Sequence, residues 1–203
     1  MPSSNPSIVL IGGPNGAGKT TISRAVISET LGIAEFVNAD VIAQGLSGFA
    51  PERAALAAGR IMLTRLKELA AARTSFAFES TLASRTLAPW FASLIESGYE
   101  LLLIYVWLRS PDVAMHRVCR RVSEGGHSVP PDVIRRRYFR SVANFVHLYL
   151  PLATRWQVYD NSTVGSPELI ASRRAGESPL IVNVRTWNRI LRIADAQSKE
   201  TDR

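Results

Sequence analysis

A glycine-rich segment near the N-terminus is the part of the sequence whose residue types and spacing specify chemistry most clearly. Residues 13–20 read GPNGAGKT and fit the spacing Gly-x4-Gly-Lys-Ser/Thr. An apolar run at 8–11 precedes the segment and predicts a buried strand, and a helical pattern follows over 19–31. In that setting, backbone N–H groups and the positive end of a helix bind phosphate groups. A chance glycine-rich turn is much the weaker interpretation.

The segment predicts a nucleotide triphosphate as ligand, bound as ATP with Mg²⁺. Lys19 is expected to reach the β- and γ-phosphates, and the Thr20 hydroxyl is expected to bind Mg²⁺. The predicted phosphate-binding residues are Gly13, Pro14, Asn15, Gly16, Ala17, Gly18, Lys19, Thr20 and Thr21.

The loop alone does not distinguish a kinase from a motor or transporter ATPase. Those ATPases need an apolar strand that ends in Asp-Glu and a signature of the LSGGQ type. Here the strongest strand pattern, 99–108, is followed by Arg109-Ser110, and Leu46-Ser47-Gly48 only begins like the signature. The pattern therefore favours a phosphotransferase over a motor.

Two acidic residues follow neighbouring strand patterns, and phosphoryl transfer to a hydroxyl needs such groups. Asp40 follows the strand predicted at 34–38, and we expect it to act as general base or as a second Mg²⁺ ligand. The alternative is an N-cap for residues 41–44. Glu79 ends the strand predicted at 75–78 and is expected to bind substrate hydroxyls together with Thr81. The alternative for Glu79 is a solvated loop residue.

Seven arginines lie on two consecutive helical patterns, separated by Gly125-Gly126-His127. They are Arg117, Arg120 and Arg121 on the first pattern and Arg135, Arg136, Arg137 and Arg140 on the second. Two helices on a glycine hinge predict a lid, at about 112–147, that brings guanidinium groups onto the transferring phosphoryl. The alternatives are a solvated basic face and a nucleic-acid groove. His127 is expected to be structural.

The elements that must position these residues alternate along the chain. The apolar runs predict six strands, at 8–11, 34–38, 75–78, 99–108, 155–159 and 180–184. Helical patterns are found at 19–31, 51–72, 87–97, 111–124, 131–147 and 187–193. Such alternation predicts a three-layer α/β fold with a mainly parallel sheet. We expect a single domain over residues 1–195 and a polar, frayed tail over 196–203.

The composition excludes several classes of protein. The chain has 203 residues, of which 46% are hydrophobic, so disorder is not expected. Its net charge of +7 suits any anionic partner and selects none. The single cysteine, Cys119, excludes an internal disulfide and is expected to be semi-buried. The longest apolar run, 101–108, is too short for a membrane helix, so a cytoplasmic protein is expected.

Together these motifs resemble the zeta-toxin-like family of P-loop kinases. The matching segments are GPNGAGKTT, VNADVIAQGL, FAFESTLAS, RVSEGGHSVPPDVIRRRYFRSVAN and VYDNS, which fall between residues 12 and 162. The resemblance implies a P-loop kinase fold with a helical lid and phosphorylation of a sugar hydroxyl by ATP or GTP. For the toxins proper the acceptor is UDP-N-acetylglucosamine, and an antitoxin protein is a possible partner.

The resemblance also implies roles for single residues. Lys19 is the phosphate-loop lysine, Asp40 the base and Glu79 a substrate-binding acid. Arg121 and Arg137 are the candidates for phosphate contact, with Arg120 and Arg136 as the neighbouring alternatives on the substrate side. Asn161 lies in a segment, Asp160-Asn161-Ser162, that resembles the loop beside the nucleotide base; the alternative is an ordinary Asx turn.

The sequence thus predicts an ATP-dependent kinase that acts on a small-molecule hydroxyl. Three alternatives remain open at this stage. A polynucleotide-directed kinase would use the arginines as a nucleic-acid track, a slow ATPase or nucleotide switch would have no acceptor, and a binding module would turn nothing over. A membrane partner is not expected, and nucleic acid is the less favoured partner.

Overall fold

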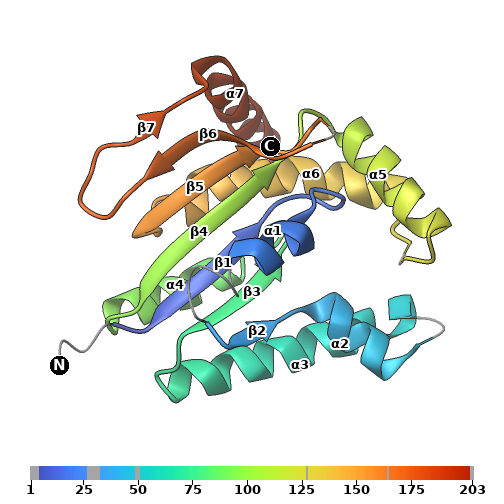
Figure 1. Cartoon of the computed structure of the whole chain (residues 1–203), viewed down its shortest axis with the longest axis horizontal. Helices are drawn as coiled ribbons and strands as arrows, with labels where there is room; N and C mark the ends of the chain where they lie inside the picture. Colours follow the sequence, from blue (N-terminus) through green and yellow to red (C-terminus); the bar gives the residue numbers. More distant parts are fainter. Residues whose placement is uncertain (1–4, 27–32, 49–50, 127, 164, 202–203) are drawn as a thin grey trace.

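The computed structural model describes residues 5–26, 33–48, 51–126, 128–163 and 165–201 and forms a three-layer α/β fold. One sheet of seven strands runs through the molecule in the order β2-β3-β1-β4-β5-β6-β7. Figure 1 shows helix α1 in front of the strands and α4 and α6 behind them. Helices α2 and α3 lie at the β2 edge, and α7 lies beside β6.

The strands are β1 Ser7–Gly12, β2 Glu35–Val37, β3 Phe76–Ser80, β4 Glu100–Trp107, β5 Arg155–Asp160, β6 Glu168–Arg173 and β7 Leu180–Ile181. The helices are α1 Lys19–Val26, α2 Ala39–Leu46, α3 Pro51–Ala71, α4 Leu87–Glu96, α5 Pro111–Ser123, α6 Pro131–Asn144 and α7 Val184–Thr201, with a π-helical turn, η2, at Phe145–Tyr149. The five strands β1 to β5 pair in parallel, and β6 and β7 add antiparallel partners at one edge. The prediction of a mainly parallel sheet is confirmed.

The position of β1 in the centre of the sheet decides what surrounds the glycine-rich loop. Gly12, the last residue of β1, pairs with Ser80 on β3 and with Tyr105 on β4. Because parallel strands end at one edge of a sheet, the loop after β1 lies between the ends of β3 and β4. Glu79 therefore lies beside the loop, as the sequence predicted.

The core forms because β1 and β4 are apolar on both faces, as central parallel strands are. Residues Leu101 to Leu108 are all buried. Tyr105 stacks on Phe145 with ring centroids 3.9 Å apart, and its hydroxyl lies 3.0 Å from Ser141 Oγ. The Tyr138 hydroxyl donates to Leu108 O at 2.7 Å. These contacts hold α6, which carries four of the seven arginines, against the sheet.

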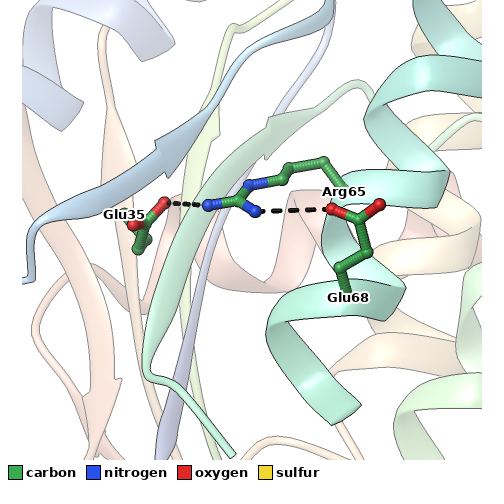
Figure 2. Close-up of polar contacts among 3 residues, drawn as sticks. All are labelled: Glu35, Arg65 and Glu68. Carbon is green, nitrogen blue, oxygen red and sulfur yellow. Dashed lines mark hydrogen bonds and ion pairs between the residues drawn. The ribbon is translucent and has the colours of Figure 1, made fainter. Parts of the chain in front are cut away.

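A small ion-pair network joins the edge strand β2 to α3. Arg65 contacts the Glu35 carboxylate at 3.0 Å and the Glu68 carboxylate at 3.4 Å, and Figure 2 shows the guanidinium between the two acids. All three side chains are exposed, so the network adds little stability. The network links the edge strand to α3 just before the chain continues into Asn38 and Asp40.

The C-terminal region departs most from the predicted elements. Strand β6 was not predicted, and the strand expected at 180–184 is limited to Leu180–Ile181. Helix α7 begins at Val184 and continues to Thr201, so the expectation of a frayed tail is wrong for 196–201. Burial of Ile190 and Ala194 against the core stabilises this helix. The division into a domain over 1–195, with a lid at about 112–147, stays a prediction.

Other element boundaries agree with the sequence within a few residues. The helix predicted at 131–147 ends at Asn144 and continues as the π-helical turn η2. The helix predicted at 19–31 is described only as far as Val26, and its remainder lies outside the described residues, as does His127. Cys119 is exposed, which corrects the expectation of a semi-buried thiol. Among the described residues, no helix is long and apolar enough to span a membrane.

Candidate active site

A cleft of about 1210 Å³ opens at the edge of the sheet where β1, β2, β3 and β5 end. Its walls come from the glycine-rich loop, the ends of β2 and β3, helices α5 and α6 and the loop after β5. The predicted site residues that line it are Asn15, Gly16, Ala17, Gly18, Lys19, Thr20, Thr21, Asp40, Glu79, Thr81, Arg120, Arg121, Arg136, Arg137 and Asn161. Gly13 and Pro14, the first two residues of the loop, are buried and do not line the cleft.

The loop has the backbone shape that a phosphate cradle requires. Gly18 has φ of +85°, and a Cβ placed there would lie 2.6 Å from Asn161 Nδ2. Asn161 Nδ2 in turn donates to Ala17 O at 2.8 Å, so the loop after β5 holds the glycine-rich loop closed. Lys19 and Thr20 begin α1, where N–H groups have no partner within the helix and are available to an anion. The loop therefore fits a nucleoside triphosphate.

Lys19 is the charged group at the centre of the cleft. Its Nζ donates to Gly13 O at 2.9 Å and to Pro14 O at 3.0 Å, so the side chain folds back over the loop. Burial lowers the Lys19 pKa from 10.5 to about 8. The negative charges of Glu79 and Asp40 act against that decrease, and the positive charges of Arg121 and Arg137 add to it. Two acids and two arginines thus surround one lysine.

Glu79 does not extend freely into the cleft, because both of its carboxylate oxygens accept hydrogen bonds from α1. Thr20 Oγ1 lies 3.0 Å from Glu79 Oε2, and Ser23 Oγ lies 2.9 Å from Glu79 Oε1. Ser23 is only 1% exposed and was not predicted as a site residue. The signal was present in the sequence, since residues three apart share one face of a helix. The solvated-loop alternative for Glu79 is wrong.

Asp40 lies in the first turn of α2 with an exposed side chain that lines the cleft. The N-cap of this helix is Asn38, whose Oδ1 accepts from Asp40 N at 2.8 Å and from Val41 N at 3.3 Å. The alternative interpretation of Asp40 as the cap is therefore wrong, because Asn38 already performs that task. The Asp40 carboxylate is left available for a proton or a cation.

The four arginines of α5 and α6 that were predicted as site residues divide into two groups. Arg121 and Arg137 are half-buried and act on the Lys19 pKa, whereas Arg120 and Arg136 are exposed. Arg120 pairs with Glu124 at 3.7 Å in the solvent. A Cβ on Gly126 would lie 2.5 Å from Arg121 Cγ, so the glycine allows the chain to turn closely over this arginine. Arg121 and Arg137, which the family motif favoured, are thus the half-buried pair whose charges act on the Lys19 pKa.

The loop after β5 forms the Asx turn that the sequence offered as one alternative, and its place beside a nucleotide base stays a prediction. Asp160 Oδ1 accepts from Ser162 N at 2.8 Å, which is an Asx turn. The Ser162 hydroxyl also contacts Asp160 and accepts from Arg109 N at 2.7 Å. Arg189 of α7 donates to Arg109 O at 2.9 Å, a long-range contact that sequence reasoning missed. The turn thus shapes the loop, and Asn161 connects it to the glycine-rich loop.

The donor atoms around Thr20 suit a hard cation. The Thr20 hydroxyl, the Glu79 carboxylate beside it and the Asp40 carboxylate line the same cleft and supply oxygen atoms, which Mg²⁺ prefers. No group of three or more His, Cys, Asp or Glu side chains able to hold a metal ion occurs in the part of the chain that the structure describes. Mg²⁺ at such sites is held by few side chains together with substrate phosphates.

Comparison with known proteins agrees with this architecture. Residues 8–143, more than half of the chain, match the family described as AAA domain. An uncharacterized protein of Haemophilus influenzae is 27% identical over 126 residues, which cover 62% of this chain and 88% of that protein.

Two solved structures are similar over nearly all of the chain. One is the AvrRxo1-ORF1:-ORF2 complex with ATP, with a TM-score of 0.75 and 16% identity over 93% of this chain. The other is from the PezAT chromosomal toxin-antitoxin system of Streptococcus pneumoniae, with a TM-score of 0.64 and 18% identity over 98% of this chain and 88% of that one. This chain spans only 64% of the length of the AvrRxo1 chain. At these identities the likeness shows the fold. The chain therefore belongs to the AAA domain family and has the P-loop kinase fold of the zeta-toxin-like proteins.

Proposed function

We propose that this protein is an ATP-dependent kinase that transfers the γ-phosphoryl group to a hydroxyl of a small molecule. The observation that supports it best is the set of charges around Lys19, which come from Asp40 in the first turn of α2, Glu79 near the end of β3, and Arg121 and Arg137 on α5 and α6. Asp40 can accept the proton of an acceptor hydroxyl, and the two arginines can stabilise the charge of the transferring phosphoryl group. These are the groups that phosphoryl transfer to a hydroxyl needs.

In this proposal the residues act as follows. The glycine-rich loop holds the β- and γ-phosphates, and Lys19 moves from the carbonyls of Gly13 and Pro14 to the phosphate oxygens. Asp40 accepts the proton of the acceptor hydroxyl as its oxygen bonds to the γ-phosphorus and the bond to the leaving ADP oxygen breaks. Arg121 and Arg137 stabilise the negative charge of the transferring group. Bound Mg²⁺ neutralises phosphate charge.

The acceptor that the family resemblance favours is a sugar nucleotide such as UDP-N-acetylglucosamine. Thr81, Arg136 and Arg140 line the same cleft as Asp40. Hydroxyl and guanidinium groups of this kind suit a sugar that carries phosphate. A protein antitoxin as partner belongs to the same proposal, supported by the likeness to the PezAT toxin-antitoxin system. Co-purification of the chain with the product of a neighbouring gene, followed by loss of kinase activity, tests that partner.

The test of the reaction uses γ-labelled ATP with a panel of sugars, sugar phosphates, sugar nucleotides and oligonucleotides. We expect label to appear on one of the small molecules and not on the oligonucleotides. Free phosphate release without labelled acceptor refutes the kinase proposal in favour of an ATPase. Label on an oligonucleotide, with binding that weakens steeply as salt rises, refutes it in favour of a polynucleotide kinase.

Two variants and one matched control test the roles of the residues. Asp40→Asn is expected to remove transfer while ATP binding stays within about twofold, since removal of a general base costs about 10²–10⁴ in rate. Arg137→Ala is expected to reduce transfer about as strongly. Arg135→Ala, two residues away and paired in the solvent with Asp112 at 3.9 Å, is expected to leave transfer unchanged. Equal losses for Arg135 and Arg137 would contradict a specific phosphate contact.

A further inference from the structure

The loop that follows β3, residues 81–84, turns sharply at Leu82. The φ angle of Leu82 is +55°, a left-handed conformation that residues other than glycine rarely adopt. Its side chain is fully buried, and a Cβ placed on Gly12 would lie only 2.6 Å from Leu82 Cδ1. The residues of this loop that line the cleft instead are Thr81, Ala83 and Ser84. The turn thus sends one side chain into the core and leaves its neighbours on the cleft.

Two buried side chains hold this loop by its backbone carbonyl groups. Asn144, the last residue of α6, donates from Nδ2 to Leu82 O at 2.8 Å. The Tyr149 hydroxyl, at the end of η2, donates to Ser84 O at 2.7 Å. Asn144 is 9% exposed and Tyr149 is fully buried. Burial raises the pKa of Tyr149 to about 12, so its hydroxyl keeps the proton that it donates.

The π-helical turn η2 explains how two residues five positions apart reach the same loop. In an α-helix, residues five apart point about 140° away from each other. Here Leu150 N donates to Phe145 O, five residues back, at 2.8 Å, so the helix contains one wider turn. In such a turn, residues five apart return to nearly the same side. A regular α-helix would point Tyr149 away from the loop that Asn144 holds.

We propose that Asn144 and Tyr149 are positioning residues for the acceptor: they hold loop 81–84 so that Thr81 and Ser84 present their hydroxyl groups to it. Neither Asn144 nor Tyr149 lines the cleft, so each acts through the loop. The loop itself carries hydroxyl groups and no charge, which suits an acceptor rich in hydroxyl groups, such as a sugar. The inference rests on the proposed kinase function. It gives Asn144 and Tyr149 a task that the sequence motifs did not assign.

The test compares the steady-state kinetics of wild type, Tyr149→Phe and Asn144→Ala with γ-labelled ATP. UDP-N-acetylglucosamine is the first acceptor used, followed by any other small molecule that takes label in the panel described above. We expect each variant to raise the KM for the acceptor about 3- to 10-fold, the size that loss of one hydrogen bond to the loop gives. The KM for ATP and kcat are expected to stay within about twofold, because the loop binds the acceptor equally before and during transfer.

Tyr99→Phe is the matched control. Tyr99 is 3% exposed, and its hydroxyl donates to backbone carbonyl groups, Ala70 O at 3.3 Å and Thr74 O at 3.1 Å. Tyr99 lies just before β4 begins, at the edge of the sheet opposite to the cleft. Its replacement is expected to lower Tm about as much as Tyr149→Phe does, and to leave the KM for the acceptor unchanged.

The outcomes separate this inference from the proposed function. If wild type labels no small molecule, the proposed function itself fails. If wild type labels an acceptor and both variants keep the wild-type KM for it, the positioning role is refuted and the kinase proposal stands. An equal rise in Tyr99→Phe, or an equal rise in the KM for ATP, also refutes it. Tyr149→Phe keeps the ring that packs on Phe91, with centroids 6.1 Å apart, so it tests the proposal even if Asn144→Ala unfolds.

Discussion

Replacement of Lys19 by methionine is expected to stabilise the protein in the absence of nucleotide while removing nucleotide binding. Burial, to which the charges of Arg121 and Arg137 add, lowers the pKa of Lys19 to about 8. At neutral pH the lysine is nevertheless charged, so the folded protein bears the cost of a buried cation. Methionine has a similar length and no charge, and removes that cost together with the attraction for phosphate.

The decrease in the Lys19 pKa sets the size of the expected gain in stability. A decrease from 10.5 to about 8 corresponds to about 3 kcal/mol, at 1.36 kcal/mol for each tenfold change in proton affinity. Lys19 keeps some contact with solvent and donates to two carbonyl oxygens, which offset part of the cost. We therefore expect Lys19→Met to be more stable by about 1–3 kcal/mol at pH 7. For a chain of this length that is a rise in Tm of roughly 3–9 °C.

The pH dependence gives the sharper assay. Because the folded pKa lies below the unfolded pKa, the unfolded chain binds more protons between pH 8 and pH 10.5, and wild-type stability gains from Lys19 as pH rises through that window. Lys19→Met has no such gain, so its advantage over wild type is full below pH 8 and disappears toward pH 10.5. Urea unfolding of wild type and Lys19→Met at pH 7 and at pH 10 measures the stability difference between them at each pH.

A control variant and a second ligand experiment complete the test. Lys67→Met removes an exposed lysine of α3, and is expected to leave stability nearly unchanged at both pH values. ATP is expected to raise the Tm of wild type and not that of Lys19→Met. The reasoning is refuted if Lys19→Met is less stable than wild type at pH 7, or if its advantage is equally large at pH 10.

Three further outcomes are expected. ATP affinity should fall by up to tenfold per pH unit above pH 8, because phosphate binding requires charged Lys19. Calorimetry between pH 7 and 9.5 measures this affinity. An affinity that does not change with pH contradicts the prediction. Gly18→Ala should abolish nucleotide binding in a folded protein, because φ is +85° and the new Cβ would meet Asn161. Gly45→Ala, which has open space around it in α2, should leave binding unchanged and stability unchanged or higher. Thermal melting and ATP titration of both variants measure this. Asn38→Ala should lower the free energy of unfolding by about 1 kcal/mol, measured by chemical denaturation, because α2 loses its N-cap. It should also lower kcat, because Asp40 is displaced. A normal kcat would show that the cap does not position Asp40.

Local signals explain why the nucleotide side of the fold could be predicted from the sequence. The glycine spacing and the helix that begins at Lys19 define the loop, and apolar runs on both sides predict parallel strands whose ends share one edge. That shared edge places Glu79 beside the loop without any knowledge of side-chain contacts. The carboxylate's partners could not be predicted, because the choice between the acceptor and α1 depends on distances of a few ångströms.

Features that depend on distant pairing were missed for a physical reason. Strand β6 is stabilised by antiparallel pairing with β5 and has no strong apolar run of its own. Helix α7 is polar at most positions and is held by a few buried residues, so its sequence resembles a tail. Arg189 reaches Arg109 only because α7 packs back toward the end of β4. Likewise, Asp40 and Asn38 are both good caps by type, and only the backbone decides between them.

The charge distribution connects the stability of the protein with its ligand. Lys19, Arg121 and Arg137 carry like charges, and the two arginines lower the proton affinity of the lysine, whereas the charges of Glu79 and Asp40 raise it. A triphosphate brings negative charge to all three at once, which turns mutual repulsion into attraction for one ligand. The excess of basic residues in the composition, which by itself selects no partner, thus acquires a specific use in this cleft.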